Sequence, residues 1–171
     1  RRHIEALRAA ASGTMAQQPY GTMVSTGGID VVDKQDGVLS TMGLSTCIFL
    51  CVVTTLHIIG WHYGATNMHG DRMHAVQQAL GSVRDEAVQY VYLVAGVDRD
   101  PNTLALLPDS RQMREVPETH PDKSRDWFVA YVQQYPWMSH VEQLHNVTHY
   151  KEIVQFHKGG YEYIRDDAFF D

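Results

Sequence analysis

The sequence predicts an α+β fold in which a mixed, largely antiparallel core, similar to a β-sandwich, is flanked by helices. Residues 48–55 and 56–65 are rich in β-branched and aromatic residues and almost continuously apolar, a pattern typical of strands buried on both faces. Their connection is short, which favours antiparallel neighbours in one sheet. Residues 71–85 and 124–135 instead carry apolar residues at helical spacing, and each segment begins at an aspartate or serine that suits a helix N-cap.

The segment before the two apolar strands predicts a peripheral helix, a connector and two further strands. Residues 1–11 fit a short helix, and residues 12–21 mix glycine, proline and polar residues as connectors do. Apolar positions within 29–32 follow a Gly-Gly pair, which predicts a strand that begins after a turn. Asp36-Gly37 is a strong turn signal, and we expect the next strand directly after it.

The second half of the chain mixes strand, loop and helix patterns. Residues 87–97 alternate and cluster apolar side chains as a strand does. Residues 98–122 hold prolines and charges, which predicts a long surface excursion with one short buried piece at 104–107. Residues 140–150 fit a helix, and residues 153–164 fit a hairpin around a Gly-Gly pair.

The length and composition predict one soluble domain over residues 1–171. The chain is 44% hydrophobic and 20% charged, as ordinary globular proteins are. Twenty acidic against fourteen basic residues give a net charge of −6, which argues against nucleic acid as the main partner. No apolar run reaches the roughly 18 residues that a membrane span requires. We therefore expect neither nucleic acid nor a membrane as partner, and a monomer.

Two cysteines, Cys47 and Cys51, are the only ones in the chain, too few for a disulfide framework, so we expect the protein to work reduced. They lie four residues apart at one predicted strand, on the same face but too far apart for an easy bridge. We interpret Cys51 as a small buried hydrophobe.

Cys47 follows a turn of small residues at the start of a buried strand, and His62 lies on the next strand. A thiol titrates near roughly 8.5, so a histidine within reach is needed to make it nucleophilic at neutral pH. The residues of the turn suit a backbone whose N–H groups point at a developing oxyanion. The combination indicates acyl transfer.

The motif Thr-Met-Gly-Leu-Ser-Thr-Cys at 41–47 resembles the nucleophile turn of the glutamine deamidases that include the chemoreceptor deamidase CheD, the catalytic domain of cytotoxic necrotizing factor and the Burkholderia lethal factor. In that superfamily a histidine on the following strand is the base, and in several members a threonine six residues before the cysteine orients it. Thr41 and His62 stand at the corresponding positions. The chain departs from the family at Thr46, where the toxins have glycine and CheD has serine.

The resemblance implies a CheD-like enzyme, without cofactor or metal, that deamidates a glutamine side chain of a target protein to glutamate. Its catalytic triad would be Cys47, His62 and Thr41, with the oxyanion turn formed by Leu44, Ser45 and Thr46. It leans towards the toxins, and so towards a bacterial effector that acts on a host protein. Such an effector would be made in the bacterial cytoplasm and secreted or translocated into the host cytosol. A chemoreceptor deamidase and a transglutaminase are the alternatives within the class.

Other interpretations of the same residues remain open. Gly60 between His57 and His62 predicts either a β-bulge or a close backbone approach. A bulge would change which face of the sheet each histidine lies on, so His57 competes with His62 as the base. Thr41 can equally satisfy backbone groups in its turn. His145 and His149 share a predicted helix face, but the glutamate of a metalloprotease motif is missing beside them. A cysteine protease would use the same dyad, and a binding module would use residues 98–122 instead.

Overall fold

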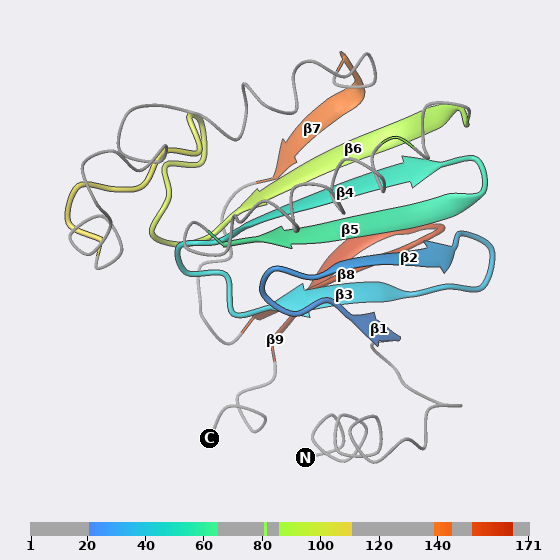
Figure 1. Ribbon diagram of the computed structural model, residues 1–171, viewed down its shortest axis with the longest axis horizontal. Helices are drawn as coiled ribbons and strands as arrows, with labels where there is room; N and C mark the ends of the chain where they lie inside the picture. Colours follow the sequence, from blue (N-terminus) through green and yellow to red (C-terminus); the bar gives the residue numbers. More distant parts are fainter. Residues whose placement is uncertain (1–20, 65–80, 82–85, 111–138, 145–151, 166–171) are drawn as a thin grey trace.

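The computed structural model describes residues 21–64, 81, 86–110, 139–144 and 152–165, which form two packed β-sheets (Figure 1). The first sheet has the strand order β1-β3-β8-β9: β1 (Thr22–Met23), β3 (Leu39–Met42), β8 (Glu152–His157) and β9 (Gly160–Arg165). The second has the order β2-β5-β4-β6-β7: β2 (Ile29–Asp33), β5 (His57–Tyr63), β4 (Ile48–Thr54), β6 (Val88–Ala95) and β7 (Val141–Leu144).

The expected α+β class is wrong for the part of the chain that the structure describes. Strands account for 56% of these residues and helical turns for 3%, and two mixed sheets replace the core flanked by helices. Neighbouring strands pair antiparallel except for β1 with β3 and β6 with β7, which pair parallel. The predicted helices at 1–11, 71–85 and 124–135 lie, apart from residue 81, outside the described residues. None of the described helical residues belongs to a helix long and apolar enough to cross a membrane.

The core lies between the two sheets and is built from aromatic and β-branched side chains. Phe49 of β4 stacks on Phe156 of β8, with ring centroids 5.7 Å apart, and Tyr92 of β6 packs on the same Phe156 ring at 5.5 Å. The packed cluster also includes Val24, Leu39, Leu44, Cys47, Cys51, Val53, Ile58, Val94, Leu144 and Val154. Burial of such a cluster is the main term that favours folding.

β4 and β5 confirm the two predicted apolar strands, and all seven residues of β4 are buried. The antiparallel pair of β8 and β9 confirms the predicted hairpin. Residues 141–144, by contrast, were expected in a helix and form β7, which pairs parallel with β6. A four-residue segment carries too little helical periodicity to resist an available strand edge, so tertiary pairing decides its conformation.

Gly60, where the sequence predicted a bulge or a close backbone approach, is instead a place where side chains from both sheets lie against the backbone of β5. The pairing of β4 with β5 runs through Cys51 and Gly60 without a shift, so β5 has no bulge there. A Cβ at residue 60 would lie 2.5 Å from Phe49 Cζ and 2.6 Å from Leu39 Cδ2. The missing side chain therefore lets a residue of each sheet meet over β5.

Replacing Gly60 by alanine should destabilise the fold, because Phe49 and Leu39 are fully buried and must repack. We expect the free energy of unfolding to fall by about 2 kcal/mol. Gly81→Ala is the matched control, since a Cβ there meets no atom within 4 Å, and it should not lower this free energy. Urea denaturation of both variants measures the difference. Equal stability of the two variants would contradict the close approach.

Candidate active site

The turn before Cys47 carries the chain from one sheet to the other. β3 ends at Met42 in the first sheet, and β4 begins at Ile48 in the second. Gly43 has φ +72°, a backbone conformation that glycine adopts without steric cost. Cys47, 9% exposed, therefore sits where the chain crosses over, directly before a fully buried strand.

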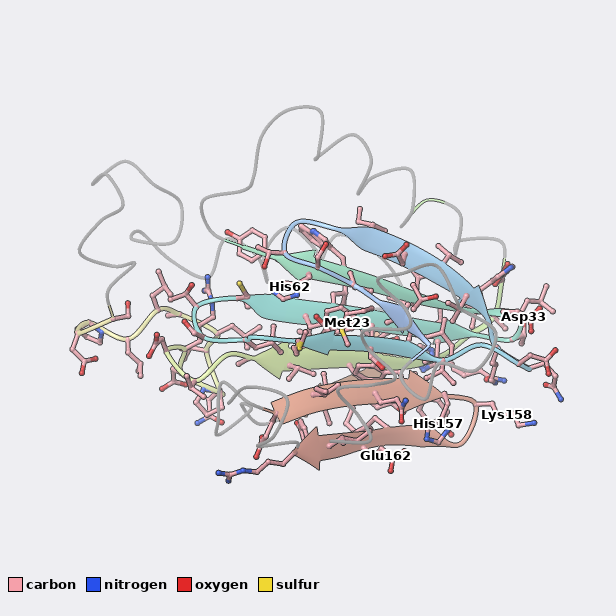
Figure 2. The ribbon with its side chains drawn as sticks, turned by 90° about the horizontal axis from the view of Figure 1, so that it is seen from below. Met23, Asp33, His62, His157, Lys158 and Glu162 are labelled. Atoms are coloured by element: carbon pink, nitrogen blue, oxygen red, sulfur yellow. The ribbon has the colours of Figure 1, made fainter. Side chains whose placement is uncertain are left out.

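His62 lies on the same face of the second sheet as Cys47. Phe49 pairs with His62 across β4 and β5, and Cys47 precedes Phe49 by two residues, so all three side chains share one face. This makes Cys47 and His62 diagonal neighbours, a relation that spans about 7–8 Å between backbones and that side chains can bridge. The imidazole lies near the end of the sandwich remote from Asp33 and Lys158 (Figure 2).

Thr41 of the first sheet holds the imidazole through its hydroxyl group. Thr41 Oγ1 lies 2.7 Å from His62 Nδ1 and donates its single proton to the Val24 carbonyl oxygen at 2.8 Å. The hydroxyl can then only accept a hydrogen bond from the ring, so the pattern assigns the proton of the neutral imidazole to Nδ1. Nε2 is left with its lone pair available.

His62 Nε2 is buried and has no hydrogen-bond partner among the described residues. The His62 side chain is 1% exposed and Thr41 is fully buried. Leaving a buried polar atom without a partner costs about 1–3 kcal/mol. The arrangement therefore keeps a basic lone pair on the face of the sheet that carries the thiol, at a cost to stability.

Burial acts on the charge of both groups. It lowers the pKa of His62 from 6.5 to about 4, although a hydrogen bond with the Val24 carbonyl acts in the opposite direction. Burial also raises the pKa of the Cys47 thiol, while the charge of Arg99 and a hydrogen bond with Thr46 act to lower it. The resting site at neutral pH thus holds a neutral thiol and a neutral imidazole.

The carbonyl groups of the predicted oxyanion turn all accept hydrogen bonds from residues 96–99. Backbone N–H groups bind two of them, from Val97 to Leu44 at 3.1 Å and from Asp98 to Ser45 at 2.8 Å, and the Arg99 guanidinium binds the Thr46 carbonyl through Nε at 2.6 Å. The next carbonyl, of Cys47, accepts a hydrogen bond from the Gly96 N–H at 2.9 Å.

These bonds determine where the N–H groups of the turn point. In a trans peptide the C=O and N–H bonds point to opposite sides, and the described residues contain no cis bond. The N–H groups of Thr46 and Cys47 therefore point away from residues 96–99, and neither has an acceptor within the described ranges. Leu44, by contrast, contributes a fully buried side chain to the core, and Ser45 Oγ donates to Asp98 at 3.3 Å.

Two residues of this site escaped the sequence analysis. Gly96 allows the close contact with the turn, because a Cβ there would lie 2.2 Å from the Ser45 carbonyl oxygen. Arg99, 1% exposed, lies in the segment expected as a surface excursion. Within that segment Leu104 and Leu106 are buried as expected, and residues 111–122 lie outside the described part. A glycine at a strand end was a weak signal for Gly96, and no signal marked Arg99.

The structure separates His57 from the other candidate residues. His57 lies at the opposite end of β5 and, at odd spacing from His62, faces the other side of the sheet. Its Nδ1 lies 2.8 Å from Glu86 Oε1.

Cys51 is fully buried in the core, as its interpretation as a small hydrophobe implied. Of the candidate metal ligands, His145 and His149 lie outside the described residues, which hold no cluster of three or more metal-binding side chains.

The tautomer of His62 is a testable consequence of the Thr41 hydrogen bond. We expect the imidazole ¹⁵N spectrum to show a protonated Nδ1 and a bare Nε2 at neutral pH. Thr41→Val removes an acceptor of this proton and should reduce the fraction of that tautomer, whereas Thr41→Ser keeps the hydroxyl and should preserve it. A bare Nδ1 in the wild type would contradict the assignment.

The lowered pKa of His62 should make the fold less stable in acid. The unfolded chain binds more protons than the folded one between about pH 6.5 and pH 4, so the free energy of unfolding falls as the pH drops through this window. The shift from 6.5 to about 4 corresponds to about 3 kcal/mol. His62→Gln should flatten the profile by this amount in denaturant titrations at several pH values. A wild-type slope retained in the variant would assign the effect to other groups.

No protein-family model matches the chain, and no curated protein matches it significantly.

Proposed function

We propose that the protein is a cysteine-dependent deamidase that converts a glutamine side chain of a target protein to glutamate. One observation carries the proposal: Thr41 Oγ1 lies 2.7 Å from His62 Nδ1, and the buried Nε2, on the face of the sheet that carries Cys47, has no hydrogen-bond partner among the described residues. Cys47 Sγ is not a hydrogen-bond partner of Nε2 in this structure, so in the proposed reaction the thiol must approach the ring for the three residues to act as nucleophile, base and a third group that orients the base.

The chemistry follows from the roles of these atoms. His62 Nε2 takes the thiol proton as Cys47 Sγ bonds to the side-chain carbonyl carbon of glutamine, and the carbonyl oxygen becomes an oxyanion. The N–H groups of Thr46 and Cys47 bind this oxyanion. The C–N bond then breaks, His62 returns the proton to the departing ammonia, and a thioester remains. Water, deprotonated by His62, attacks the thioester, and the thiol leaves with that proton to give glutamate.

The resting charges favour general-base catalysis in the first step. The pKa of His62 lies at about 4 and the pKa of the thiol is raised, so the pair does not exist as thiolate and imidazolium before substrate binds. The proton moves only as the new bond forms. Activity should therefore depend on a neutral imidazole and fall once His62 becomes protonated in acid.

A purely structural role explains the site less well. A binding module gains nothing from a buried Nε2 that has no partner among the described residues, which costs about 1–3 kcal/mol and which a phenylalanine would avoid. The same geometry serves an amine in place of water, which gives transglutamination, and it serves peptide cleavage. We place glutamine deamidation first on the motif at 41–47, with a host-cell protein as the target of a bacterial effector and a chemoreceptor as the alternative.

The test is to incubate wild-type protein and Cys47→Ser with lysates of bacterial and eukaryotic cells and to map modified glutamines by mass spectrometry. We expect glutamine-to-glutamate conversion at specific sites with the wild type alone. His62→Gln should lose this activity, because Nε2 is the base, whereas His57→Gln is the matched control and should retain it.

The other outcomes separate the alternatives. A cross-link to an amine would indicate a transglutaminase, and chain cleavage would indicate a protease. If no modification depends on Cys47 in either lysate, the binding module becomes the better account of the site.

A further inference from the structure

Arg99 is the largest fully buried side chain among the described residues, with 1% of its surface exposed. A buried guanidinium is costly unless its donors are satisfied. Two of them bind backbone carbonyls: Nε donates to Thr46 at 2.6 Å and a terminal nitrogen donates to Leu104 at 2.7 Å. The group also lies over the Tyr63 ring, with 5.7 Å to the centroid, a cation–π contact. Because a buried charge is costly, packing alone is a weak reason for an arginine at this position.

The first of these bonds acts on the peptide that joins Thr46 to Cys47. Because the Thr46 carbonyl points at the guanidinium, the Cys47 N–H points to the opposite side of the same peptide plane. The neighbouring Thr46 N–H is aimed in the same way, since the Ser45 carbonyl accepts a bond from the Asp98 N–H at 2.8 Å. Two successive N–H groups that point to one side are able to bind one anion together.

The position of the charge gives Arg99 a second effect. Its positive charge acts to lower the pKa of the Cys47 thiol, against the larger effect of burial. Other titratable groups near the turn include His62, which is neutral at pH 7, and Asp98, whose carboxylate accepts a bond from Ser45 Oγ. Arg99 is thus the cation that favours the thiolate at this turn among the described residues.

We propose that Arg99 is a positioning residue of the deamidase site, which fixes the Thr46–Cys47 peptide with its N–H toward the reacting carbonyl and stabilises negative charge on Cys47. The role of Arg99 in orienting the Thr46–Cys47 peptide rests on the proposed function. Its effect on the charge of the Cys47 thiol can be measured without a substrate.

The experiment compares Arg99→Met, which keeps length without charge, with Arg99→Lys, which keeps charge without the planar fork. Arg165→Met, a substitution of an arginine on β9, is the matched control. Each variant is first checked by circular dichroism and urea denaturation. The rate of Cys47 alkylation by iodoacetamide is then measured against pH, in a Cys51→Ala background, and kcat and KM are measured on a mapped glutamine substrate.

We expect Arg99→Met to shift the alkylation profile to higher pH and to lower kcat about 100-fold, the effect of losing one oxyanion donor, with KM little changed. Arg99→Lys should keep the alkylation profile close to that of the wild type but lose kcat. Arg165→Met should change neither. A folded Arg99→Met protein with a wild-type alkylation profile and a wild-type kcat would overturn the proposal. A wild-type kcat in Arg99→Lys would overturn the role of the planar guanidinium.

Two features keep the outcome decisive. If no glutamine substrate is ever found, the proposed function fails but the alkylation profiles still decide the role of the charge. If both variants fail to fold, the wild type supplies the test: the Arg99 Nε–H resonance in ¹⁵N spectra should shift with the same pH midpoint as Cys47 alkylation. If the chemical shift of the Arg99 Nε–H does not change over the pH range in which Cys47 titrates, this result would contradict the proposal.

Discussion

The hydrogen bond between Thr41 and His62 is the constraint on which the site depends, because it joins the two sheets at the point where the chain crosses between them. Thr41 belongs to β3, and β3 is held against Val24 by a backbone bond of 2.8 Å from the Val24 N–H to the Ser40 carbonyl. The backbone of His62 is paired on both sides, with Phe49 of β4 and with the turn before β2. With both partners fixed in this way, the ring has one defined orientation, and Nε2 is the nitrogen that has no hydrogen-bond partner among the described residues.

The turn before Cys47 is also fixed by hydrogen bonds, here to its backbone carbonyl groups. A chain that crosses between sheets leaves the regular ladder, and its buried carbonyls must find donors elsewhere. Residues 96–99 supply them, and they approach closely because residue 96 has no side chain. Bonds that satisfy the carbonyls necessarily direct the opposite N–H groups away from that segment. The stability of the turn and the orientation of its N–H groups, on which the proposed oxyanion site depends, therefore come from one set of contacts.

The sequence was informative where the signal was local. Continuous apolar runs predicted β4 and β5, and the Gly-Gly pair predicted the hairpin of β8 and β9. The spacing around Cys47 singled out Thr41 and His62, which are in contact in the structure. It failed where the outcome depends on distant partners. β7 pairs with the edge of β6, and the buried Arg99 binds a carbonyl of the turn at 43–47. No pattern within either segment contains that information.

Burial sets the chemistry of the site as much as hydrogen bonding does. A neutral imidazole and a neutral thiol are both cheaper to enclose than an ion pair, so the fold can bury them at the end of the sandwich without a compensating charge between them. In the proposed mechanism, a negative charge that develops on substrate in such a place would interact more strongly with fixed N–H dipoles than it would in water. The groups proposed to bind it would need no reorganisation, since the fold has oriented them in advance. The cost of that orientation, an Nε2 without a partner among the described residues and an enclosed guanidinium, is offset by the aromatic core between the two sheets.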